Sequence, residues 1–114
     1  MIIVGNIKNN GRNLGGIKVY IGRKGYGFEQ SPLACPFVIG RDGSRDEVVN
    51  SYRKWLFTRY KEGGAVLNEL RRLCDIAKRE HLVLLCWCAP LKCHGDIVKA
   101  CLEWMIRKEV EKPC

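Results

Sequence analysis

The residue types best suited to chemistry gather in one short stretch, from Cys86 to Asp96. It holds three thiols and an imidazole within nine positions, at Cys86, Cys88, Cys93 and His94. Thiolate sulfur and imidazole nitrogen bind zinc, and thiolates hold iron–sulfur clusters. A thiol beside an imidazole can also act as a nucleophile with its base. This stretch is therefore the first candidate for a functional site.

A metal site is one interpretation of the cluster. Its candidate ligands are Cys86, Cys88, Cys93 and His94, with Cys35 as a further thiolate. Cys86 and Cys88 would share one face of a strand, but residues i and i+2 lie about 6 to 7 Å apart there. Thiolates on one metal ion lie nearer, at roughly 4 Å, and the spacing is not a common metal signature. Zinc and an iron–sulfur cluster both stay open as cofactors.

Catalysis is a second interpretation. Cys93 or Cys88 would be the nucleophile and His94 its base, with Asp96 orienting the histidine. The stretch falls where a buried strand ends and a helix begins, and a helix start offers N–H groups that can bind a phosphate and lower a thiol pKa. A third interpretation is structural: the cysteines pack as small hydrophobes, and His94 and Asp96 cap the helix.

The chain pattern predicts the elements that position this stretch. Two β-branched runs, at 2–4 and 17–21, predict strands that could pair as a hairpin. Glycines and prolines across 22–43 predict a long loop, and loops of that length are often functional. The remaining elements, predicted from hydrophobic periodicity, are helices over 45–60 and 66–79, a buried strand over 82–88 and a helix over 94–110.

Together these elements predict an α/β fold. Ser44 and Glu47 have the spacing of a capping box, which marks the start of the first helix. The order of elements predicts a last strand parallel to one of the first. We therefore expect one small domain over 1–114, in two or three layers, with a short, mostly parallel sheet and about three helices.

Composition bounds the function. The longest apolar run, 82–89, is too short to cross a bilayer, so no membrane partner is expected. The start of the chain lacks the features of a signal peptide, so we expect a cytoplasmic location. The seven cysteines are then better explained as free thiols, metal ligands or catalytic groups than as disulfides. A net charge of +8 favours an anionic partner such as a nucleotide or nucleic acid.

The first part of the long loop could contact such a partner. Residues 22–28 combine three glycines with two cations and two aromatic rings. That mixture suits a phosphate and a stacked base. The glycines fit neither the G-x-G-x-x-G dinucleotide fingerprint nor a Walker phosphate loop, so a plain turn is at least as good an alternative.

Several longer motifs resemble a known family. They are VYIGR at 19–23, SPL at 31–33, PFVIGRDG at 36–43 and LCWCAPLKCHGD at 85–96. Over about 17–103 the sequence resembles the small family catalogued as domain of unknown function 4326, which occurs in phages and bacteria. The resemblance implies no activity. The sequence departs from the family at Ala34 and Cys35, where Gly-Asn or Ala-Asn is usual.

The resemblance also implies that the long loop and the cysteine stretch belong to one site. Arg23, Ser31 and Arg41 would then be its polar binding residues, together with Cys88. We expect a domain that binds a nucleotide or nucleic acid and could process a nucleotide or base through the Cys/His site. The alternative is a non-catalytic binding module stabilised by zinc or an iron–sulfur cluster, such as a phage protein acting on host nucleic-acid machinery.

Overall fold

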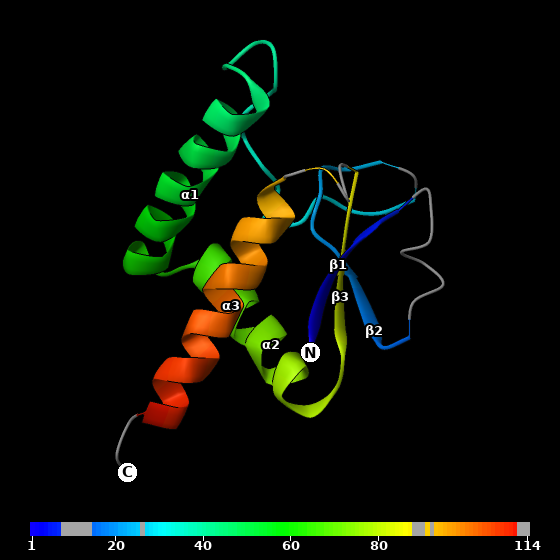
Figure 1. Ribbon diagram of the computed structural model, residues 1–114, viewed down its shortest axis with the longest axis vertical. Coiled ribbons are helices and arrows are strands. Elements are labelled where there is room, and N and C mark those ends of the chain that lie inside the picture. Colours follow the sequence, from blue (N-terminus) through cyan, green and yellow to red (C-terminus); the bar gives the residue numbers. More distant parts are fainter. Residues whose placement is uncertain (8–14, 26, 88–90, 92, 112–114) are drawn as a thin grey trace.

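Three helices and a three-stranded sheet make up the fold, which confirms the predicted α/β class (Figure 1). The computed structural model describes residues 1–7, 15–25, 27–87, 91 and 93–111, without the side chains of the last two. In chain order the elements are β1 (Ile2–Asn6), β2 (Ile17–Tyr20), α1 (Arg45–Glu62), α2 (Ala65–Arg79), β3 (Leu82–Cys86) and α3 (His94–Glu111).

The sheet has the order β1-β3-β2, and both strand pairs are parallel. Leu82 lies in register with Ile2 on one side and with Ile17 on the other. The expected hairpin of the first two strands is therefore wrong. The reason is that β3 is buried along its whole length, and such a strand is most stable between two neighbours that satisfy both its edges.

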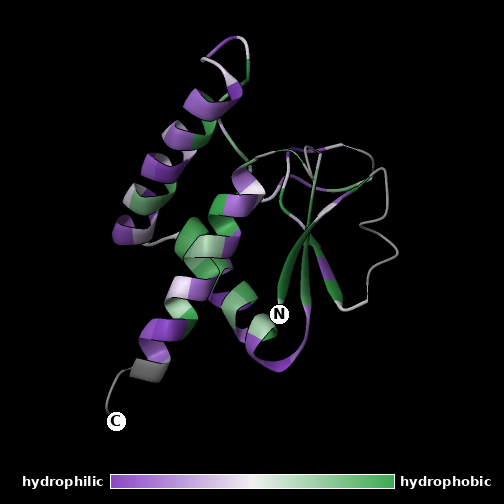
Figure 2. Cartoon of the chain, in the orientation of Figure 1, coloured by the Kyte–Doolittle hydropathy of each residue, from purple (hydrophilic) through white to green (hydrophobic). Residues whose placement is uncertain are grey.

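All three helices lie on one side of the sheet, where α2 and α3 pack against its strands and α1 packs against α2 and α3. Leu82, Leu84 and Cys86 point into the main core with them, whereas Val83 and Leu85 belong to a smaller cluster on the other face. The main core also joins the helices to one another, because each helix packs against the other two. Figure 2 shows the largely hydrophobic strands beside helices with mixed polar and apolar surfaces. The described chain is thus a two-layer arrangement.

Local signals place the helix boundaries where the sequence predicted them. The side chain of Ser44 accepts a hydrogen bond from the N–H of Glu47, and the Glu47 carboxylate accepts one from the N–H of Ser44, which completes the capping box. Gly63 has a positive φ of 83° and ends α1. No helix in the described ranges is both long enough and apolar enough to cross a membrane.

Candidate functional site

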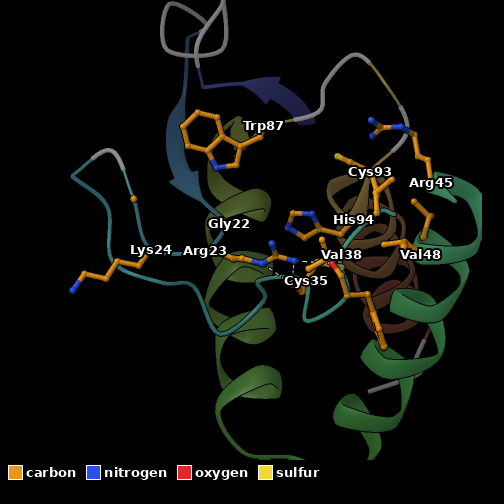
Figure 3. Close-up of a pocket in the computed structure, with 14 residues that line it drawn as sticks. Gly22, Arg23, Lys24, Cys35, Val38, Arg45, Val48, Trp87, Cys93 and His94 are labelled. Atoms are coloured by element: carbon orange, nitrogen blue, oxygen red, sulfur yellow. Dashed lines mark hydrogen bonds between the residues drawn. The ribbon is translucent and has the colours of Figure 1, made fainter. Parts of the chain in front are cut away.

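A cavity of about 420 Å³ lies where the sheet, the long loop and two helix starts meet (Figure 3). Its walls come from the segment after β2, the loop before α1, the first turns of α1 and α3, and the residue after β3. The lining residues are Gly22, Arg23, Lys24, Gly25, Cys35, Phe37, Val38, Ile39, Arg45, Val48, Val49, Trp87, Cys93 and His94. The cavity thus lies at the carboxyl edge of a parallel sheet, where α/β proteins bind ligands.

His94 is held in one orientation at this cavity. Its ring Nε2 lies 2.8 Å from the carbonyl oxygen of Ile21 and, because a carbonyl only accepts, Nε2 carries the proton. The edge of the ring meets Tyr52, with 5.2 Å between ring centroids. Burial lowers the pKa of His94, and the nearby charge of Arg23 lowers it further, so the ring is neutral at pH 7.

The second ring nitrogen of His94 is then an acceptor. Nδ1 has a lone pair in this tautomer, and no hydrogen bond to it is found in the described structure. A ligand in the cavity could donate an N–H or O–H to this atom.

Arg23 ties the loop together beside His94. Its Nε and Nη2 donate to the carbonyl of Cys35 at 3.1 and 2.9 Å, and Nη2 also donates to the carbonyl of Phe37 at 2.7 Å. The third nitrogen, Nη1, makes none of the described hydrogen bonds. Figure 3 shows the guanidinium next to the His94 ring. An arginine fixed in this way offers a preorganised donor to an anion.

The charge of the lining is all positive. Arg23, Lys24 and Arg45 are among its 14 residues, and none of the 14 is Asp or Glu. Arg45 is the first residue of α1, so its charge adds to the N–H groups of that helix start. Lys24 extends outward from the other labelled side chains in Figure 3, at the rim. The site therefore favours an anion.

Two aromatic side chains give the lining flat apolar faces. Phe37 belongs to the loop before α1, and Trp87 follows β3. The indole of Trp87 is fixed, because its Nε1 donates to the hydroxyl of Tyr20 at 2.8 Å and the two rings meet edge to face at 6.3 Å. Such faces can stack against a base.

Cys93 begins α3 as its N-cap. Its sulfur accepts a hydrogen bond from the N–H of Gly95 at 3.3 Å, and the carboxylate of Asp96 accepts one from the N–H of Cys93 at 3.0 Å. The first bond is a sulfur cap on the second residue of α3, and the second bond is the carboxylate half of a capping box. Asp96 therefore caps the helix, while the carbonyl of Ile21 orients His94.

The thiol of Cys93 also meets a second thiol. Its Sγ lies 3.2 Å from the Sγ of Cys86, and both residues are buried. The hydrogen bond to Cys86 raises the pKa of the Cys93 thiol, and burial raises it further. The expectation of a lowered pKa at the helix start is thus wrong, because a neighbouring sulfur and a dry environment outweigh the helix dipole.

The proposed metal ligands are only partly brought together. In the part of the chain that the structure describes, no three His, Cys, Asp or Glu residues could share a metal ion. The sulfur of Cys35 donates to the carbonyl of Phe37 at 3.5 Å. Cys88, predicted as a ligand, nucleophile and binding residue, lies outside the described residues. The zinc or iron–sulfur interpretation stays a prediction.

Two other predicted binding residues shape the loop. The hydroxyl of Ser31 is buried and accepts a hydrogen bond from the N–H of Leu33 at 3.0 Å. Arg41 pairs with Asp42 at 2.8 Å and donates to the carbonyl of Pro36 at 3.4 Å. Neither belongs to the lining residues. Among the predicted residues, the cavity joins Arg23 and Cys35 to Cys93 and His94.

Sequence reasoning missed Arg45 and the two aromatic faces. An arginine in the first turn of a capped helix has the pattern of a solvated residue, and Trp87 lies on a strand that was expected to be core. The one available signal was position: Phe37 lies inside the predicted loop at 22–43, Arg45 lies two residues after it, and Trp87 lies near the end of the strand predicted over 82–88.

The comparisons with known proteins agree with the motifs. No curated protein and no solved structure matches the chain. The model of one family, described as Domain of unknown function (DUF4326), matches residues 5–104 of the 114. This range contains the cavity-lining residues and both cysteines of the buried pair. The chain belongs to this family of proteins with a DUF4326 domain.

Proposed function

We propose that the domain binds a nucleotide in the cavity at the carboxyl edge of its sheet. The observation that carries the proposal is the lining itself: three cations, no carboxylate and two aromatic faces around about 420 Å³. A nucleotide is an anion with a flat ring, and this volume is typical of small-molecule sites.

The binding mode follows from the positions of the groups. The phosphate would lie between Arg23 and Arg45, close to the start of α1. The base would stack on Phe37 or Trp87. His94 would accept a hydrogen bond at Nδ1 from a ribose hydroxyl or a base N–H. A concave site of this kind suits a mononucleotide better than a continuous duplex, which needs an extended basic surface.

The same geometry bears on catalysis. A thiol nucleophile must lose its proton, and the raised pKa of Cys93 keeps that thiol protonated. Processing of a nucleotide through Cys93 is therefore the weaker form of the hypothesis, and binding is the stronger form. The metal-stabilised module, an origin in phages and a cytoplasmic location stay predictions from the sequence.

A thermal-shift screen tests the proposal. Wild-type protein would be melted with millimolar AMP, GMP, CMP, UMP and ATP, and with the matching nucleosides and inorganic phosphate. A ligand at 100 times its Kd stabilises the folded state by about 2.7 kcal/mol, which is a shift of several degrees. We expect a nucleotide to raise the melting temperature more than its nucleoside or phosphate does.

Paired variants on α1 supply the control. Arg45→Gln removes a lining charge, whereas Arg53→Gln removes an exposed charge from the same helix outside the lining. The nucleotide shift should fall by half or more in Arg45→Gln and stay unchanged in Arg53→Gln. The proposal is wrong if no nucleotide shifts the wild-type melting temperature, or if both variants lose the shift equally.

A further inference from the structure

The two buried thiols at the base of the cavity are placed for a reaction with each other. The sulfurs of Cys86 and Cys93 lie 3.2 Å apart, at the end of β3 and the start of α3. Cys86 is fully buried, and Cys93 is 3% exposed. Close packing explains one buried thiol without difficulty, but it does not require two to meet at the junction that carries the cavity.

We propose that Cys86 and Cys93 form a reversible disulfide that joins β3 to α3. A disulfide bond is about 2.05 Å long, so the two sulfurs need to approach by roughly 1 Å. Both lie on the helix-covered face of the sheet, and the chain between them spans residues 87–92. The proposal does not depend on the identity of the cavity ligand.

The oxidant would be a small disulfide such as oxidised glutathione. The raised pKa of Cys93 makes its thiolate rare at pH 7, so the exchange is slow there and faster at higher pH. The thiolate, formed by loss of its proton to solvent, attacks one glutathione sulfur, which forms a mixed disulfide and releases one reduced glutathione. Cys86 then loses its proton and attacks the sulfur of Cys93, which releases the second glutathione. Two thiols are oxidised to one disulfide, and one glutathione disulfide is reduced to two thiols.

The cavity supplies the route for this reagent. Cys93 lines the cavity, whereas Cys86 is fully buried and is not among the lining residues. The order of attack follows from this access. The cross-link would lie directly beside two residues of the lining, because Trp87 follows Cys86 and His94 follows Cys93. Oxidation would therefore change the lining of the same cavity.

Peptide mapping after oxidation tests the proposal directly. The full chain, purified under reducing conditions, would be incubated with oxidised glutathione, denatured in iodoacetamide and digested with trypsin. Cleavage after Lys92 separates residues 80–92 from 93–99, so a Cys86–Cys93 bond appears as these two peptides joined. Dithiothreitol should separate them again.

Two variants assign the sulfurs, because Cys88 shares the first peptide with Cys86. The joined peptides should persist in Cys88→Ser and disappear in Cys86→Ser. A third variant, Cys74→Ser, removes a buried cysteine from α2 and should leave the bond unchanged. The bond should also raise the melting temperature of Cys88→Ser by several degrees.

The proposal is overturned if 93–99 is recovered unlinked and alkylated after long oxidation of the wild type. It is equally overturned if the joined peptides vanish in Cys88→Ser, since the bond would then use the other cysteine. The wild-type and Cys88→Ser maps decide the question even if Cys86→Ser does not fold.

Discussion

The hydroxyl of Tyr52 holds the long loop against α1, and removing this hydroxyl tests that contact. Tyr52 is fully buried, and its hydroxyl donates to the carbonyl of Leu33 at 2.6 Å. Tyr52→Phe keeps the ring and leaves that buried carbonyl without this donor. A buried polar group left without its partner costs about 1 to 3 kcal/mol, and we expect about 2 kcal/mol of lost unfolding free energy.

Urea unfolding followed by circular dichroism measures this loss. For a domain of this size, 2 kcal/mol corresponds to a fall in melting temperature of roughly 8 °C. Tyr60→Phe is the matched control, because Tyr60 is partly buried on the same helix and its hydroxyl has no hydrogen bond in the described structure. The reasoning is refuted if both variants stay within about 0.5 kcal/mol of the wild type.

Three further perturbations test other parts of the structure. A Cβ at Gly95 would lie 2.9 Å from Cγ1 of Val4, so Gly95→Ala should cost about 1 to 3 kcal/mol in urea unfolding, whereas Gly25→Ala meets nothing within 4 Å and should cost far less. Hydrogen bonds in the first capping box lower the pKa of Glu47. The ionised Glu47 therefore stabilises the fold above about pH 4.3, and this contribution is lost as pH falls through the folded pKa. Glu47→Gln should show a smaller fall in melting temperature between pH 6 and pH 3 than the wild type. Burial lowers the pKa of His94, so its contribution to stability is full above about pH 6.5 and falls as pH drops toward the folded pKa. His94→Gln should therefore show a smaller change in melting temperature between pH 7.5 and 5.5 than the wild type. The same change in both proteins would contradict a role of His94 in this pH dependence.

The sequence predicted elements whose signals are local. The capping box at Ser44 and Glu47 and the glycine at Gly63 bound α1 through contacts a few residues apart, and these contacts form wherever the helix lies. Strand order is different, because β1 and β2 each pair with a strand that comes some 60 or more residues later. No residue near β1 or β2 indicates whether the two strands pair with each other in a hairpin or lie on either side of β3.

The candidate site was predictable in position and less so in chemistry. A buried strand followed by a helix start predicted the carboxyl edge of the sheet, where Cys93 and His94 line the cavity. The pKa direction of Cys93 depends on Cys86, whose sulfur reaches it from the sheet. Such a contact between elements is invisible in a one-dimensional pattern. The same holds for Arg45, which only the folded loop brings to the cavity.

A heteronuclear NMR titration would test nucleotide binding at this cavity most directly. The chain has three tryptophans, and of these Trp87 lines the cavity, so its indole N–H signal serves as the reporter. On addition of the nucleotide that gives the largest thermal shift, we predict saturable changes in the Trp87 indole signal and in the backbone signals of Arg23 and His94. Signals of Trp55 and Trp104 should move little. Changes confined to the exposed faces of the helices, or none at millimolar nucleotide, would contradict the proposed site.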